Sequence, residues 1–220
     1  MLGKEEIKKI IIDQGMLPLY YHPSAEVSIA VLEALYKAGV KAIEYTNRGE
    51  HAIANFKAMR KLVTEKMPGM QLGIGTIKTT ADAQAFMDAG ADFIICPVVN
   101  PEIAKLVQSK GFLWIPGCMT PTEIDEAERN GASLVKIFPG NILGPGFVSA
   151  IRELFPNLLF MPTGGVEVDE NNLQGWFKAG VVAVGMGSKL ITKGVLENQQ
   201  YEDLEKLTVK ALELVKSCKN

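Results

Sequence analysis

A lysine stands in the middle of an apolar segment. Residues 133–139 read Ser-Leu-Val-Lys-Ile-Phe-Pro, a short run rich in apolar and β-branched residues that predicts a buried parallel strand. Side chains alternate along a strand, so Leu134, Lys136 and Phe138 share one face. A buried ammonium group is costly unless it is paired, neutral or used in chemistry. The alternative is a lysine at the strand end whose amine reaches water, and the segment alone leaves both interpretations open.

A carboxylate has a similar place in an earlier predicted strand. Glu44 shares a face with Ala42 and Thr46, whereas the bulkier Ile43 and Tyr45 point to the other side. The bulky pair would face covering helices, which directs Glu44 to the inner face. A buried ion pair with the lysine could be purely structural, although such pairs rarely stabilise a fold relative to apolar replacements.

Groups suited to anions follow three of the predicted strands. Gly164-Gly165 and Gly187-Ser188 leave backbone N–H groups open to an anion, and a helix expected from Ser188 would add a positive helix end. Arg48 suits a carboxylate because guanidinium is a rigid two-pronged donor. Tight turns and a solvated surface arginine are the structural alternatives.

The elements that position these residues alternate regularly. Expected strands cover residues 16–21, 40–45, 71–75, 92–96, 112–115, 133–138, 158–161 and 181–184. Expected helices cover 3–14, 24–38, 49–66, 79–89, 101–109, 120–130, 145–155, 170–179, a short segment from 188, and 201–216. This alternation predicts an α/β fold, a (β/α)8 TIM barrel with an added N-terminal and C-terminal helix, as one domain over 1–220. An open doubly wound sheet is the alternative, and in a barrel the polar strand ends above would meet at one face.

The composition of the chain argues against two classes of partner, nucleic acids and membranes. The 220-residue chain has a formal net charge of −2 and no dense basic run, which argues against nucleic acid as a partner. No segment resembles a signal peptide or is apolar enough to span a bilayer, so no membrane partner is expected. Three widely spaced cysteines fit a reducing cytoplasm.

The ordered strand-end motifs resemble the class I aldolases of 2-keto-3-deoxy-6-phosphogluconate, a group that includes 4-hydroxy-2-oxoglutarate aldolase and the phosphogalactonate homologues. Each motif alone is generic, but the set is collinear from about Pro18 to Leu190. The motifs are Glu44-x-Thr46-x-Arg48, Gly73-x-Gly75-Thr76, Pro116-Gly117, Lys136-x-Phe138-Pro139, Pro162-Thr163-Gly164-Gly165 and Gly187-Ser188.

The resemblance implies a cytoplasmic homotrimer of (β/α)8 barrels that serves the Entner–Doudoroff pathway with neither metal nor cofactor. Its substrate would be a phosphorylated 2-keto-3-deoxy sugar acid, cleaved to pyruvate and glyceraldehyde 3-phosphate. By motif, Lys136 would form the Schiff base and Glu44 would be the general acid and base. Arg48 and Thr76 would hold the pyruvate carboxylate, Thr163 would orient the substrate, Pro97 and Phe138 would wall the pocket, and Gly164, Gly165, Gly187 and Ser188 would bind the phosphate.

Some positions depart from the family pattern. Asn47, Val98 and Met186 stand where relatives often have other residues, and each could reshape the pocket. Gly144-Pro145 favours the phosphogalactonate branch, whereas Thr163 favours the phosphogluconate branch. The configuration of the substrate therefore stays open at this point.

Three other functions remain as alternatives. A phosphate-sugar isomerase, epimerase or synthase barrel would use similar glycine loops without forming an imine. A metal-dependent aldolase would need ligands at several strand ends, whereas both histidines, His22 and His51, are expected in loops or at the surface. A non-catalytic binding barrel would have no need of both Glu44 and Lys136.

Overall fold

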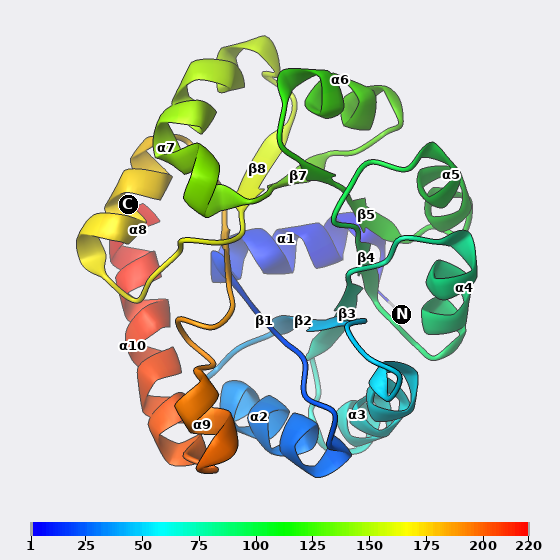
Figure 1. Ribbon diagram of the computed structural model, residues 1–220, viewed down its shortest axis with the longest axis vertical. Coiled ribbons are helices and arrows are strands. Elements are labelled where there is room, and N and C mark those ends of the chain that lie inside the picture. The colour runs from blue at the N-terminus through cyan, green and yellow to red at the C-terminus, as the bar shows by residue number, and fades with distance from the viewer. Residues whose placement is uncertain (1, 220) are drawn as a thin grey trace.

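The computed structural model describes residues 2–219. Strands and helices alternate along the chain, and Figure 1 shows the helices arranged around a central group of strands, except α1, which lies across the middle of the ring. The strands are β1 (Met16–Tyr20), β2 (Ala42–Thr46), β3 (Gln71–Gly75), β4 (Phe93–Ile95), β5 (Leu113–Ile115), β6 (Gly117–Cys118), β7 (Leu134–Ile137), β8 (Leu159–Pro162) and β9 (Val184–Met186). The helices are α1 (Lys4–Gln14), α2 (Ala25–Lys37), α3 (Ala52–Lys66), α4 (Thr80–Asp88), α5 (Pro101–Ser109), α6 (Pro121–Arg129), α7 (Gly140–Ile151), α8 (Glu170–Lys178), α9 (Lys193–Glu197) and α10 (Tyr201–Lys219), with a short 3-10 helix at Arg152–Leu154.

The strands form a curled parallel arrangement of the TIM-barrel type. Six strands pair in the order β5-β4-β3-β2-β1-β9, and a second sheet has the order β6-β7-β8. All of the strand pairs in both sheets are parallel. The expected α/β alternation is confirmed, but the expected single closed eight-stranded sheet is not what the described residues form.

The two sheets meet at two seams. At one seam Pro116 separates β5 from β6, because proline has no N–H to donate to the ladder, and its carbonyl accepts the N–H of Lys136 at 2.8 Å. At the other seam the N–H of Val182 donates to Phe160 at 3.0 Å, and Thr163 and Gly185 form an isolated parallel bridge. The expected fifth strand, 112–115, corresponds to β5, and the structure adds a short strand after Pro116, β6, that was not expected.

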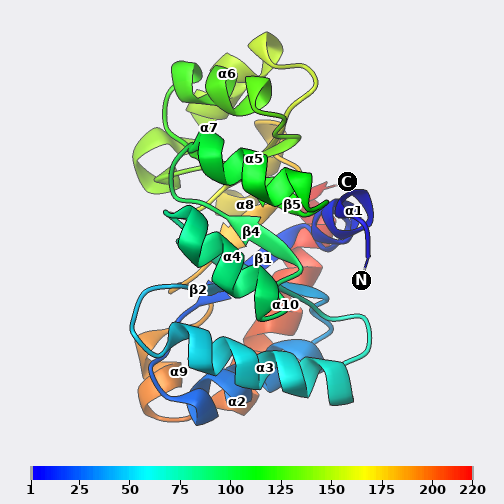
Figure 2. The same ribbon diagram turned by 90° about the vertical axis from the view of Figure 1, so that its right-hand side faces the viewer.

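Helix α1 closes the lumen at the end where the strands begin. Ile7 and Ile11 of this helix are buried in one apolar cluster with Leu17, Ala42 and Leu134, which lie at or next to strand starts. Figure 2 shows α1 at one edge of the molecule, where the last turn of α10 also lies. The lumen is consequently apolar and sealed at this end, and polar side chains can face it only at the other.

Local sequence signals explain many of the boundaries. The Ser24 hydroxyl accepts the N–H of Val27 at 3.3 Å and starts α2, as expected. Helices α2, α4 and α8 are each followed by a glycine with a left-handed backbone, at Gly39 (φ 98°), Gly90 (φ 93°) and Gly180 (φ 99°). These are the recurrent Ala-Gly pairs of the sequence, and glycine adopts this conformation without the strain that a Cβ would bring.

Three expected elements need correction. The helix expected from Ser188 is a single turn, in which Leu190 and Ile191 donate to the Gly187 carbonyl at 2.9 Å, and the extended Thr192 then caps α9. The last strand begins at Val184 instead of 181, because its partner β1 begins only at Met16. Helix α7 begins at Gly140, ahead of the expected 145, and is broken where Gly144 has φ 71°.

Within residues 2–219, no helix has both the length and the apolar character that a bilayer crossing requires.

Candidate active site

Lys136 and Glu44 face each other inside the ring of strands. Lys136 lies on β7 and Glu44 on β2, and Nζ lies 3.5 Å from Glu44 Oε1. The two residues are only 5% and 1% exposed, so the lysine does not reach water as a surface group would. Each stands two residues after an apolar lumen residue, Leu134 and Ala42 respectively. Side-chain alternation from the sealed end therefore places the pair on the open side of the lumen.

Two glycines leave room for polar side chains in the lumen, which form one layer that contains Lys136, Glu44 and Thr163. A Cβ atom on Gly75 of β3 would overlap Glu44 Oε1, and one on Gly185 of β9 would overlap Thr163 Oγ1. Neither glycine has a positive φ, so the close approach of a neighbouring side chain, and not backbone conformation, explains them. In the sequence pattern Gly-x-Gly at residues 73–75, the second glycine is thus a packing requirement of the site, whereas the first makes room for the ring of Phe93.

Two polar atoms in this layer have no hydrogen-bond partner among residues 2–219. They are Glu44 Oε2 and Thr163 Oγ1, both fully buried. Buried polar atoms in folded proteins are almost always paired, so such atoms mark places that call for an explanation. A polar ligand in the lumen would supply the missing partners.

A cavity of about 390 Å³ lies next to the pair: Thr163 and Phe138 line it, whereas Lys136 and Glu44 do not. The Phe138 ring lines it and lies 5.4 Å, centroid to Nζ, from Lys136. Seven of the residues expected at the site line this cavity, namely Arg48, Phe138, Thr163, Gly164, Gly165, Gly187 and Ser188. The structure thus gathers most of the residues singled out from the sequence around one opening.

Glycine conformation shapes the loop that follows β8. Gly164 and Gly165 have φ values of 97° and 71°, in the left-handed region. Asn172, in the first turn of α8, holds this loop, because its side chain donates to the Gly165 carbonyl and accepts the Glu167 N–H, both at 3.0 Å. The loop is therefore fixed before any ligand arrives.

Thr76 and Pro97 do not line the cavity. Thr76 follows β3, next to the strand that carries Glu44, and Pro97 follows β4, with its carbonyl against Gly117. Pro97 is therefore not part of this cavity, and its role as a wall of the pocket stays a prediction. Thr76 has φ 61°, and a β-branched residue in this region is under backbone strain, which is often found at functional sites.

None of the three residues that depart from the family pattern lines the cavity. Met186 is buried in the outer cluster between strands and helices, so it does not enter the lumen. Val98 is 51% exposed. The N–H of Asn47 donates to the Gly75 carbonyl at 2.9 Å and extends the pairing of β2 with β3.

Sequence reasoning missed three polar residues of the cavity. Tyr21, Lys189 and Lys193 all line it, and both lysines belong to the segment that follows β9. Lys189 comes directly after Ser188, so its position beside an expected phosphate loop was the available signal. Two lysines and Arg48 make the mouth of this cavity cationic.

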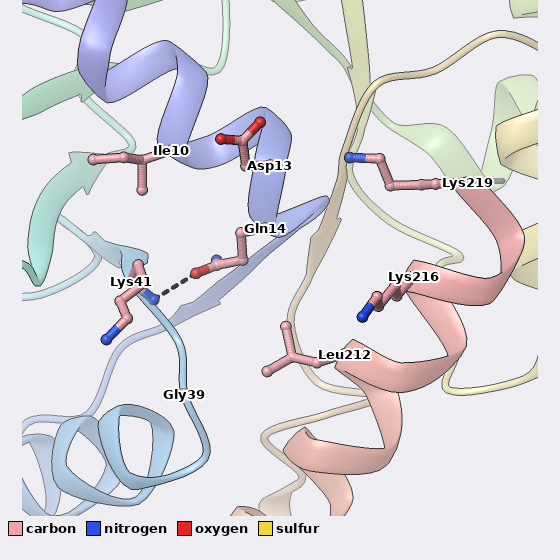
Figure 3. Close-up of a pocket in the computed structure, with 8 residues that line it drawn as sticks. All are labelled: Ile10, Asp13, Gln14, Gly39, Lys41, Leu212, Lys216 and Lys219. Carbon is pink, nitrogen blue, oxygen red and sulfur yellow. Dashed lines mark hydrogen bonds between the residues drawn. The ribbon is translucent and has the colours of Figure 1, made fainter.

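A larger cavity, of about 600 Å³, lies at the sealed end of the barrel (Figure 3). Several of its polar groups have partners: the Gln14 side chain accepts the Ala42 N–H at 3.1 Å and donates to the Ala42 carbonyl at 2.9 Å. The Lys219 amine donates to the Ile12 carbonyl. Burial lowers the pKa of Lys219, and nearby Asp13 opposes that shift. This cavity lies where the terminal helices α1 and α10 meet. Among the described residues, it has no buried polar atom without a partner comparable to Glu44 Oε2 or Thr163 Oγ1.

Comparison with known proteins agrees with the geometry. Residues 7–207 match the family described as KDPG and KHG aldolase, the aldolases of 2-keto-3-deoxy-6-phosphogluconate and of 4-hydroxy-2-oxoglutarate. A probable 2-dehydro-3-deoxy-6-phosphogalactonate aldolase of Rhizobium meliloti is 33% identical over 171 residues, which are 77% of this chain and 78% of that protein. A 2-dehydro-3-deoxy-phosphogluconate aldolase of Pseudomonas aeruginosa is 31% identical over 187 residues, 84% of this chain and 82% of that protein.

A solved structure is also similar. It is the KDPG aldolase of Legionella pneumophila with pyruvate captured at low pH as a covalent carbinolamine intermediate. That structure superposes with a TM-score of 0.82 and 26% identity, over 91% of this chain and 95% of its own. The match to the family model covers most of the chain, and the relatives are aligned over most of their own lengths. This chain therefore belongs to the KDPG and KHG aldolase family and is a lyase.

Proposed function

We propose that the protein is a class I aldolase that cleaves 2-keto-3-deoxy-6-phosphogluconate to pyruvate and glyceraldehyde 3-phosphate through an imine on Lys136. The observation that carries the proposal is the buried pair in which Lys136 Nζ lies 3.5 Å from Glu44 Oε1. One amine and one carboxylate, enclosed together next to a cationic cavity, are the groups that imine chemistry requires.

Imine formation uses both groups. The neutral Lys136 amine attacks the C2 carbonyl carbon of the substrate, the carbonyl electron pair moves to oxygen, and one proton passes from the nitrogen to that oxygen. The resulting carbinolamine loses its hydroxyl group as water when Glu44 delivers a proton to that oxygen. The nitrogen lone pair then forms the C=N bond of the iminium ion.

Bond cleavage follows from the iminium ion. Glu44, now a carboxylate, takes the proton of the C4 hydroxyl group, and C4 becomes the aldehyde carbon of glyceraldehyde 3-phosphate. The electron pair of the C3–C4 bond moves into a C2–C3 double bond, and the iminium nitrogen accepts the displaced pair as an enamine. Protonation at C3 and hydrolysis of the imine release pyruvate and restore the lysine.

The cavity provides for the two charged ends of the substrate. Arg48 and Thr76 would hold the carboxylate near Lys136, and Phe138 would pack against the reacting carbons. Gly164, Gly165, Gly187 and Ser188 would bind the phosphate through backbone N–H groups and a hydroxyl group. The support is that all of these residues except Thr76 line one cavity.

Thr163 is the residue proposed to orient the substrate. Its buried hydroxyl has no partner among residues 2–219 and would suit a substrate hydroxyl group. Because relatives of similar identity are named for the gluconate and the galactonate, phosphogalactonate and 4-hydroxy-2-oxoglutarate stay as alternative substrates. Family membership does not favour an isomerase or epimerase.

The proposal also covers the oligomeric state, the cellular location and the absence of a metal or cofactor requirement. The family resemblance supports one (β/α)8 domain over 1–220 that assembles as a homotrimer in the cytoplasm and needs neither metal nor cofactor. Light scattering behind a sizing column should give three times the chain mass. Activity should be indifferent to a chelator.

Cleavage of three substrates, measured side by side, tests the proposal. We expect the phosphogluconate substrate to be cleaved with the highest kcat/KM and the unphosphorylated hydroxy-oxoglutarate with the lowest. Lys136→Ala should abolish cleavage of all three. Full activity in Lys136→Ala would remove the basis of the proposal, and faster cleavage of the phosphogalactonate would correct the substrate.

A further inference from the structure

Two lysines stand on the phosphate side of the cavity, where the glycine loops offer only backbone dipoles. Lys189 lies in the turn after Ser188, and Lys193 is the first residue of α9. Gly164 and Gly165 follow β8, which is next to β9 in the ring. Full positive charge is therefore concentrated on the side of the cavity formed by the loops that follow β8 and β9.

The two lysines are not equally available. Lys189 forms an ion pair with Glu167 at 2.7 Å, in which the side chains are 57% and 47% exposed. Lys193 is 86% exposed and lies 3.5 Å from Glu197, one turn along the same helix. The first pair links the loops after β8 and β9, whereas the second stays within α9.

Glu167 is held more firmly than its partner. Its backbone N–H donates to Asn172 Oδ1 at 3.0 Å, and the same asparagine binds the Gly165 carbonyl. Lys189 is on a turn closed by backbone bonds to Gly187, and its long side chain can turn between Glu167 and an anion in the cavity. Glu167 therefore offsets part of the Lys189 charge that an anion would meet.

We infer that Lys189 and Lys193 set the preference of this enzyme for a substrate that ends in a phosphate over one that ends in a carboxylate, and that Glu167 limits the contribution of Lys189. The inference rests on the proposed function and concerns its substrate class. A phosphate monoester carries about −1.5 to −2 charges at pH 7, whereas a carboxylate carries one. Each cation in the mouth thus favours the phosphate more strongly, and each anion opposes it more strongly.

Replacing a lysine and replacing Glu167 should change the substrate preference in opposite directions. Lys189→Gln and Lys193→Gln should each lower the kcat/KM ratio of the phosphorylated substrate to 4-hydroxy-2-oxoglutarate by about two- to fivefold, the range for a solvent-exposed charge. Glu167→Gln should raise the same ratio by a similar factor. Lys189→Arg should keep the wild-type ratio, because it keeps the charge. All of these effects should shrink at high salt.

Two variants serve as matched controls. Lys178→Gln removes a lysine at the last residue of α8, far from the loop that begins that helix. Glu65→Gln removes an exposed carboxylate near the end of α3, on another part of the ring. Both should leave the ratio within twofold of wild type, because neither residue lines the cavity or pairs with a lysine that does.

Direct binding of inorganic phosphate separates this inference from the proposed chemistry. Calorimetric titration needs no turnover, and Glu167→Gln should bind phosphate more tightly while Lys189→Gln and Lys193→Gln bind it more weakly. Unchanged phosphate affinity and an unchanged substrate ratio in the two lysine variants would overturn the inference. A wild-type protein that cleaves no substrate would count against the proposed function, whereas the phosphate titration would still test the charges.

Discussion

Gly75 and Glu44 form a packed pair in which the absence of a side chain on one residue makes room for the carboxylate of the other. A Cβ atom at Gly75 would overlap Glu44 Oε1, although the glycine itself has an ordinary strand backbone. The two residues come from neighbouring strands, with Glu44 opposite Gly73 in the pairing register. The position of the acid is therefore set by β3 as well as by its own strand.

Gly75→Ala should damage catalysis more than folding. The added methyl group would push the Glu44 carboxylate away from Lys136, and a displacement of a reacting group by about 1 Å can cost up to about a hundredfold in rate. We expect kcat/KM to fall by about tenfold to a hundredfold. Gly146→Ala is the matched control, because no heavy atom lies within 4 Å of the Cβ it would add. Equal activity in the two variants would refute the packing argument.

The strained backbone of Thr76 predicts a difference between two small replacements. Thr76 has φ 61°, and a residue with a Cβ pays about 1–2 kcal/mol in this region, whereas glycine does not. Thr76→Gly should therefore be more stable to urea than Thr76→Ala by about 1 kcal/mol. Both variants should lose affinity for pyruvate if the hydroxyl group holds its carboxylate. Pyruvate binding at the wild-type level in both would show that Thr76 serves only the loop.

Helix α1 is expected to stabilise the barrel by filling the sealed end of the lumen. Ile11 is fully buried there, so Ile11→Ala should lower the free energy of unfolding by about 2–5 kcal/mol. Ile12→Ala makes the same chemical change at a half-buried position and should cost less. Urea titrations of both variants measure the difference, and equal losses would mean that α1 does not plug the lumen.

Two buried thiols make stability depend on alkaline pH. Burial raises the pKa of both Cys96 and Cys118 from 9.0 to about 12. In the unfolded chain these thiols ionise near their ordinary pKa, so the stability they contribute is complete below pH 9 and is lost as the pH rises towards 12. The free energy of unfolding should fall above pH 9, and less steeply in Cys96→Ala.

Thiol labelling gives an independent check of the same burial. Iodoacetamide at about pH 8 reacts with thiolates, so it should modify the half-buried Cys218 and spare the two buried cysteines. Peptide mass spectrometry identifies the modified sites. Rapid labelling of Cys96 in the folded protein would contradict its burial in the hydrophobic core.

Much of the architecture could be predicted because its signals are local. Helix α5 has the expected bounds, since Asn100 accepts the N–H groups of Glu102 and Ile103 and Pro101 fills the first helical position. Alternation along two strands was enough to direct Lys136 and Glu44 into the lumen. These inferences needed only the period of a strand and the preferences of a helix start.

Other features depend on contacts that no local pattern encodes. The short strand β6 after Pro116 depends on a ladder with β7, and the placement of Lys189 depends on how the turn after Gly187 closes. The left-handed backbone of Thr76 runs against the preference of its residue type. Tertiary packing decides the structure at these positions, and one of them, Lys189, lines the cavity of the candidate site.

Trapping with borohydride tests the central claim most directly. Incubation of the protein with pyruvate and sodium borohydride should reduce an imine to a stable amine, so a pyruvyl-derived mass should appear on the peptide that contains Lys136. Lys136→Ala should give no adduct, and Glu44→Gln should give it more slowly, because the dehydration step would lack its acid. An adduct confined to Lys136 is the result that this account predicts. A protein that cleaves substrate but gives no adduct, or gives one on another lysine, would contradict it.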